Sequence, residues 1–163
     1  MITATAPLLH HIYLSKGHDY WGRQGEGRLQ QGIIECEEVE CVAGMGLLGD
    51  RYFNYRPDFK GQVTFFDQEV VVAIRQKFKL PKLPASIFRR NLIVSGLDLK
   101  SLKGEKFVFQ GIEFEGSQEC KPCHWMDRVI DPGAEEFMKS EFRGGLRAKI
   151  LTSGRLRKGL ALG

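Results

Sequence analysis

The chain consists mostly of short apolar stretches of strand-like pattern, separated by turns that contain glycine. These stretches recur at residues 8–14, 32–42, 61–66, 87–94, 106–110, 112–115, 146–152 and 156–162. Only two segments show the three- and four-residue spacing of an amphipathic helix. Many short strands with few helices favour a closed antiparallel architecture. The sequence therefore predicts a mainly β, single-domain β-barrel with a few short helices.

Both expected helices begin at an acidic residue. Asp67 can cap the free amide groups of a first turn, and the helix would run to about Phe78. Its apolar residues then share one stripe: Val70, Val71, Ile74 and Phe78. A second, shorter helix is expected after Asp131 and Pro132, with Ala134, Phe137 and Met138 facing inward.

Length and charge narrow the class of partner. A chain of 163 residues is long enough for one domain, here taken as residues 1–163, with a substantial core. The net charge of +4 suits an anionic small molecule at least as well as nucleic acid. No run of lysine and arginine marks a nucleic-acid face. We expect a small-molecule ligand and no nucleic-acid partner.

The first fourteen residues resemble neither a signal peptide nor a membrane span. No basic segment precedes the apolar residues there, and no long apolar stretch follows. The sequence therefore predicts a cytoplasmic protein without a membrane segment, in which thiols stay reduced. Cys36 and Cys41 lie at odd spacing in the expected strand at 32–42, so their side chains would face opposite sides and could not pair. At least one of them is expected to be buried and inert.

The segment from Glu119 to Trp125 carries two thiols within a stiff loop. Pro122 fixes its own φ angle and disfavours a helical conformation at Lys121. Thiolates are strong nucleophiles and soft metal ligands, and a neighbouring cation such as Lys121 favours the charged form. Cys120 and Cys123 are therefore candidates for chemistry.

Four interpretations of this thiol pair compete. Cys120, Cys123 and His124 match a c-type haem attachment pattern, but the chain shows no export signal. Zinc would need a further pair of ligands, which the sequence does not offer at a suitable spacing. A thioredoxin-like dithiol would need an α/β pattern around it. A thiolate that ligates a cofactor or carries sulfur is favoured, and a thiol-disulfide redox protein or a zinc-stabilised binding module remains the alternative.

Two further stretches could hold an anion. Arg51 follows a glycine-rich segment at 44–49, where the backbone can approach a ligand closely. In the expected strand at 87–94, Arg89 and Asn91 would share one face, because strand side chains alternate. A guanidinium group binds phosphate through two parallel hydrogen bonds.

A polar, glycine-rich surface loop is expected at 15–31.

Four segments, taken in order along the chain, resemble the MOSC domain family, named for the C-terminal part of molybdenum-cofactor sulfurases. They are Gly46-Leu47-Leu48-Gly49-Asp50-Arg51, residues 89–99 beginning Arg89-Arg90-Asn91, Cys120-Lys121-Pro122-Cys123, and Arg143-Gly144-Gly145-Leu146-Arg147-Ala148. The resemblance extends from about residue 32 to residue 163. Each motif alone is short, and the ordered set is what makes the resemblance specific.

This resemblance implies a β-barrel-like fold that binds the molybdenum cofactor, a pterin phosphate with a dithiolene-held metal. It also implies a cysteine that carries sulfur or, as in amidoxime-reducing relatives, ligates molybdenum. The family cysteine falls on Cys123, the expected metal ligand, with Cys120 as a frequent companion. The expected cofactor-binding residues are Arg89, Asn91, Arg51, Arg147 and the cation beside the thiols, Lys121.

The chain also departs from its family. Tyr52 stands where the family often has histidine. The pyridoxal-phosphate domain of full sulfurases is absent from this sequence, so pyridoxal phosphate is not an expected cofactor. The resemblance implies a sulfurtransferase or a component of a molybdenum-dependent reductase, with a cysteine desulfurase or a molybdoenzyme as the expected protein partner.

Overall fold

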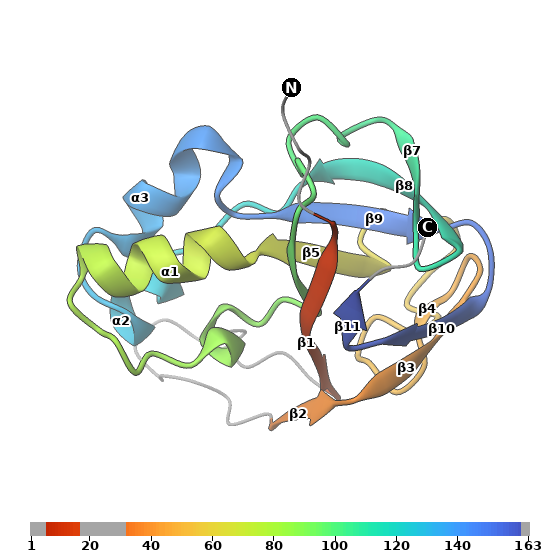
Figure 1. Cartoon of the computed structure of the whole chain (residues 1–163), viewed down its shortest axis with the longest axis horizontal. Coiled ribbons are helices and arrows are strands. Elements are labelled where there is room, and N and C mark those ends of the chain that lie inside the picture. Colours follow the sequence, from red (N-terminus) through yellow and green to blue (C-terminus); the bar gives the residue numbers. More distant parts are fainter. Residues whose placement is uncertain (1–5, 17–31, 161–163) are drawn as a thin grey trace.

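An eight-stranded mixed sheet forms the centre of the fold (Figure 1), in a computed structural model that describes residues 6–16 and 32–160. The spatial order is β11 (Gly159–Leu160), β1 (Leu8–Ser15), β6 (Leu92–Ser95), β5 (Val63–Asp67), β9 (Leu146–Ile150), β8 (Ile112–Glu119) and β7 (Lys106–Phe109), with β2 (Ile33–Cys36) also paired to β1. β5 and β6 run parallel, and the other pairs are antiparallel. Most of the loop expected at 15–31 lies outside the described residues.

A second sheet contains three antiparallel strands, β10 (Gly154–Arg157), β3 (Glu38–Val42) and β4 (Gly46–Leu47). The single long strand predicted at 32–42 is wrong, because the chain breaks at Glu37 and its two halves enter different sheets. Cys36 and Cys41 are therefore separated by the sheet boundary. Cys41 has no exposed surface, and burial raises the pKa of its thiol to about 12, so the expectation of one inert cysteine is confirmed.

The predicted barrel does not form. A barrel requires the first and last strands of a sheet to pair with each other. Among the described residues the path of the large sheet ends at β7 on one side and at β11 on the other, and these two strands are not partners. Helices cover one face of this open sheet (Figure 1), and the small sheet lies at the opposite end of the view. The expectation of a mainly β fold with a few short helices is confirmed.

β5 separates two apolar cores. Its side chains alternate, so that Phe65 enters the core shared with the small sheet and Phe66 enters the core beneath the helices. The Phe65 ring contacts three other rings edge-on, with centroid distances of 5.2–6.0 Å. Phe66 stacks on Phe88 at 4.7 Å. Because both faces are covered, the residues from Val63 to Phe66 are all buried.

Three α-helices pack over the Phe66 core: α1 (Gln68–Lys77), α2 (Trp125–Val129) and α3 (Ala134–Lys139). The predicted cap of α1 is confirmed, since the Asp67 carboxylate accepts a hydrogen bond from the Glu69 amide at 2.8 Å. The sequence pattern did not predict α2, whose Trp125 and Met126 are buried. Among the described residues no helix is long and apolar enough to cross a lipid bilayer.

The strand predicted at 87–94 is correct only in its second half. Residues Ala85–Phe88 form a 3₁₀ turn, η1, and β6 begins at Leu92. Arg89 ends the turn in the left-handed region, at φ 54° and ψ 38°. Packing of the Phe88 ring in the helical core overrides the strand-like pattern of these residues. Arg89 and Asn91 are consequently not neighbours on a strand face.

The close contact of β8 with the loop at Leu102 predicts a large steric effect at Gly116. A Cβ atom on Gly116 would overlap the carbonyl oxygen of Leu102, a backbone atom that cannot rotate away. We expect Gly116→Ala to lower the free energy of unfolding by about 2 kcal/mol or more. Gly32→Ala, where an added Cβ meets nothing within 4 Å, is the matched control and should change it by less than about 1 kcal/mol. Urea unfolding measures both, and equal effects would contradict the close packing.

Candidate functional site

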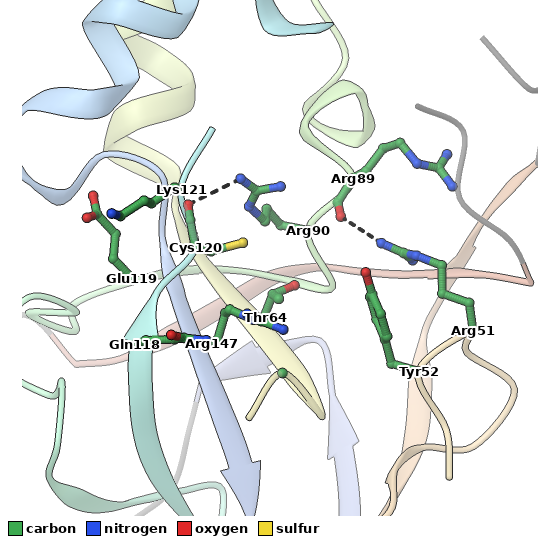
Figure 2. A pocket seen from close by; sticks show the side chains of 11 residues that line it. Arg51, Tyr52, Thr64, Arg89, Arg90, Gln118, Glu119, Cys120, Lys121 and Arg147 are labelled. Atoms are coloured by element: carbon green, nitrogen blue, oxygen red, sulfur yellow. Dashed lines mark hydrogen bonds between the residues drawn. The ribbon is translucent and has the colours of Figure 1, made fainter. Parts of the chain in front are cut away.

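A cavity of about 510 Å³ opens where the ends of β5, β8 and β9 meet the connections that precede β6 and follow β4 (Figure 2). Its floor is a cross-strand row: Arg147 on β9 lies opposite Thr64 on β5 and Gln118 on β8. Directly opposed residues of antiparallel strands share one face, so all three point into the cavity. A register shift in β8 before Gln118 sets this alignment.

The cavity is strongly cationic. Five basic residues line it, against the single carboxylate of Glu119: Arg51, Arg89, Arg90, Lys121 and Arg147. Low-dielectric walls strengthen such a field, and clustered cations repel one another when no anion is bound. The arrangement favours an anionic ligand over a neutral or cationic one.

Arg147 has no acidic partner. In the part of the chain that the structure describes, its guanidinium makes no hydrogen bond or ion pair, and it lies 5.2 Å from the centre of the Phe59 ring. Gly61 makes room for it, because a Cβ atom there would come within 2.6 Å of the guanidinium nitrogens. A half-buried guanidinium without a partner leaves up to five donors available to a ligand.

Arg51 is partly anchored and keeps one buried donor without a partner among the described residues. Its Nη1 lies 3.4 Å from the buried carboxylate of Asp50, and its Nη2 donates to the Arg89 carbonyl oxygen at 3.4 Å. Its Nε is buried and has no hydrogen-bond partner among the described residues. A buried donor without an acceptor costs free energy, so this atom indicates a place for an acceptor oxygen from a ligand or water.

Arg90 holds in place the loop that carries Cys120 and Cys123, here called the thiol loop. Its guanidinium donates to three backbone carbonyl oxygens, those of Phe88 at 2.9 Å, Gly144 at 3.0 Å and Cys120 at 3.4 Å. Gly144 is necessary for this approach, because a Cβ atom there would overlap the Cys120 carbonyl oxygen. The sequence reading placed Arg90 on the opposite side from the anion site, and the structure brings it to the cavity wall.

The two thiols of the loop lie in different surroundings. Cys120 is half-buried and lines the cavity, with its sulfur turned toward Arg90 (Figure 2). Cys123 is exposed and does not line the cavity. Between them Pro122 is buried against Gly144. The sequence offered both cysteines without a means of telling which one faces the cavity.

Arg89 and Asn91, the predicted anion pair, take separate positions. The Arg89 guanidinium points away from Cys120 (Figure 2) and donates to the Ser15 hydroxyl at 2.8 Å. Asn91 is 2% exposed and does not line the cavity. Its amide oxygen accepts from the Thr64 amide at 3.0 Å and from the Thr64 hydroxyl, and its nitrogen donates to the Tyr13 carbonyl oxygen. Asn91 therefore supports the cavity from behind, whereas Arg89 lines its wall, and their predicted roles as ligand contacts stay predictions.

Tyr52 is a cavity residue to which the sequence reading gave no role. Burial raises the pKa of its phenol, while the positive charges of Arg51 and Arg147 oppose that shift and the nearby Cys120 thiol adds to it. The phenol therefore keeps its proton at neutral pH. Its position directly after Arg51 in the glycine-rich motif was the available signal.

No three potential metal-binding side chains of histidine, cysteine, aspartate or glutamate cluster within the described ranges 6–16 and 32–160. The cavity thus offers one thiol and several cations. Chemically it can bind an oxyanion and place it beside a nucleophilic sulfur.

Comparison with known proteins agrees with this fold. The sequence matches the family model of the MOSC domain over residues 49–162. The comparison with curated proteins found no match in sequence. The crystal structure of the YuaD protein from Bacillus subtilis is similar with a TM-score of 0.71 and 18% identity, covering 98% of this chain and 95% of that one.

Two structures of YiiM are similar as well. The protein from Geobacillus stearothermophilus has a TM-score of 0.66 at 16% identity, over 96% of this chain and 75% of that one. The protein from Escherichia coli has a TM-score of 0.61 at 18% identity, over 80% of this chain and 65% of that one. At such identities the likeness shows a shared fold.

The buried bonds of Asn91 predict a structural role that can be measured. We expect Asn91→Ala to lower the free energy of unfolding by about 2–4 kcal/mol, because the Thr64 donors and the Tyr13 carbonyl oxygen lose their partner in a buried place. Gln110→Ala is the control, since its amide also bridges backbone groups, but near the surface. Urea unfolding compares the two. An Asn91→Ala protein as stable as the wild type would contradict this structural role.

Proposed function

Because this chain belongs to the MOSC domain family, we propose that its cationic cavity binds the molybdenum cofactor and that a loop thiol serves as sulfur carrier or metal ligand. The observation that carries this proposal is the convergence of several cations and one thiol on a single cavity, where Arg147 and the buried Nε of Arg51 have donors without a partner among the described residues. A cofactor with a phosphate and a sulfur-bound metal needs both kinds of group. The family match supports the class of ligand, and the lining of the cavity supports the choice of residues that would bind it.

The residues present fit a pterin phosphate. The cavity volume of about 510 Å³ lies in the usual range of small-molecule sites, roughly 300–1,000 Å³. Arg147 and the Nε of Arg51 have donors to spare for phosphate oxygens, and Lys121 adds a charge at the exposed rim. Tyr52 adds a ring and a protonated hydroxyl. Asn91 acts indirectly, by holding Thr64 of β5 in place, and the Arg89 carbonyl oxygen holds Arg51.

The chain contributes binding, orientation and a sulfur atom. The bound group supplies a metal that accepts soft sulfur donors. Arg90 holds the Cys120 backbone, so the thiol faces the interior of the cavity with little freedom. The family position of the cysteine falls on Cys123, and the cavity position falls on Cys120. We assign Cys120 as the thiol that faces the bound group and Cys123 as its competitor for this role.

The reaction class is sulfur transfer or molybdenum-dependent reduction, in which this chain acts as a carrier or component. A cysteine desulfurase or a molybdoenzyme is the proposed partner class. The exposed position of Cys123 leaves that thiol accessible to such a protein.

Removal of the unpaired cation should weaken cofactor retention without unfolding the protein. We expect Arg147→Gln to bind the cofactor about 10–100-fold more weakly, since a charge-assisted hydrogen bond contributes about 1.5–3 kcal/mol. The measurement is pterin fluorescence after acid oxidation of protein equilibrated with cofactor. Gly61→Ala tests the same contact differently, because its methyl group displaces the guanidinium and keeps the charge.

Arg157→Gln is the matched control for this charge removal. Arg157 is an exposed arginine on β10 that pairs with Glu38, outside the cavity. Its loss should leave retention unchanged within about twofold, since a screened surface charge acts weakly over distance. Equal weakening by Arg147→Gln and Arg157→Gln would mean that net charge, rather than this cavity, binds the cofactor.

The two cysteine variants decide which thiol acts. We expect Cys120→Ser to abolish cofactor-linked sulfur transfer, and Cys123→Ser to retain at least about a tenth of it, because only Cys120 lines the cavity. Both proteins should keep wild-type unfolding midpoints. The reverse order would assign the role to Cys123, as the family position suggests. Equal and complete loss in both variants would favour a dithiol mechanism.

A further inference from the structure

The position of Cys120 restricts which sulfur donors can reach it. The thiol is half-buried in the wall of a cavity, and its loop is fastened by Arg90 and by the Cys120 amide, which donates to the Gly145 carbonyl oxygen at 2.8 Å. A thiol on another protein would have to enter this cavity to meet it. A donor of a few heavy atoms can enter without moving the loop.

The charge around the thiol restricts the donor further. Arg147 and Lys121 have no acidic partner among the described residues, and Arg90 binds carbonyl oxygens only. The buried Nε of Arg51 lacks an acceptor. These groups favour a donor that brings negative oxygen atoms, and they favour a negatively charged leaving group in the transition state.

We propose that Cys120 takes its sulfur from a small dianionic sulfane donor of the thiosulfate type, with Arg147 and Arg51 binding the sulfonate oxygens. This proposal rests on the proposed function in one respect, the assignment of Cys120 as the reactive thiol of the cavity. It adds the chemical class of the donor and a second use of the same cations.

The step balances without an oxidant or a reductant. The Cys120 thiolate attacks the outer sulfur of thiosulfate. A bond forms between this sulfur and the Cys120 sulfur, and the bond between the outer and the central sulfur of thiosulfate breaks. Sulfite leaves with the electron pair of that bond, and its charge develops beside the guanidinium groups. Cys120 is left as a persulfide. Sulfite release then frees the cations for the phosphate of the cofactor, so donor and cofactor occupy the site in turn.

The test uses thiosulfate with the full chain and measures released sulfite together with the mass of the Cys120 peptide. The wild-type protein should release about one sulfite per chain in a first turnover and gain one sulfur atom at Cys120. Added cyanide should remove that sulfur as thiocyanate and restore the thiol. Cys120→Ser should release no sulfite, and release at the wild-type rate from this variant would overturn the proposal.

The anion-binding role of Arg147 is separated from a general effect on the thiol by a neutral reagent. Arg147→Gln and Gly61→Ala should each slow loading from thiosulfate by roughly tenfold or more, and should change alkylation of Cys120 by iodoacetamide less than about threefold. Arg157→Gln should load at the wild-type rate. Equal slowing of both reactions would overturn the assignment of the donor site.

Failure of this inference can be distinguished from failure of the proposed function. Protein that retains the pterin cofactor and releases no sulfite from thiosulfate would refute the donor class alone. Protein that loads Cys120 from thiosulfate and retains no cofactor would refute the proposed cofactor and leave the donor site intact. Phosphate and sulfite should each slow loading in proportion to their occupancy of the cavity, and an absence of competition would contradict the shared cation site.

Discussion

The cavity depends on one close backbone contact, between the residues that enter β9 and the loop that carries Cys120. Gly144 and Gly145 have no side chains, and this allows the Cys120 carbonyl oxygen and the Phe65 carbonyl oxygen to approach where Cβ atoms would otherwise lie. The Cys120 amide donates to the Gly145 carbonyl oxygen across this contact. Arg90 completes it by donating to carbonyl oxygens on both sides. The result is a thiol fixed against the sheet at the point where Arg147 projects from β9.

Among the described residues, the Arg147 guanidinium and the Nε of Arg51 contribute no hydrogen bond or ion pair to the stability of the fold. Positive charges gathered in one cavity repel one another, and the buried Nε of Arg51, which has no acceptor among the described residues, adds a further cost. Elsewhere on the surface the basic residues pair with acids, as Arg155 does with Glu38 and Glu40. Strain of this kind, together with the left-handed backbone at Arg89, is typical of sites that bind ligands.

Several parts of the site could be predicted from local residue chemistry. The glycine-rich motif before Arg51, the glycine pair before Arg147 and the two clustered thiols were all visible as short patterns. The cap at Asp67 was also predictable, since a side-chain cap acts within three residues. The prediction failed where distant packing decided the backbone. Phe88 stacks on Phe66, so residues 85–88 form a 3₁₀ turn in place of a strand. Arg89 and Asn91 therefore do not share a strand face.

The closure of the sheet was beyond local reasoning as well. Alternating short strands are compatible with a barrel or with an open sheet covered on both faces, because each strand sees the same apolar neighbours in either case. The pairing of β2 and β3 with different sheets broke the predicted long strand at Glu37, and helices over the Phe66 core cover one face of the large sheet.

By itself the sequence determined the chemistry available to this protein: one thiol pair, several arginines beside glycine turns, a mainly β fold and membership of a family. Only the tertiary structure decided which of these groups meet. It turned Cys120 inward and left Cys123 outside, brought Arg90 to the thiol loop, and placed Asn91 behind the cavity as a brace. The physical reason is that residue type sets what a side chain can bind, whereas its direction follows from backbone contacts between segments far apart in the chain.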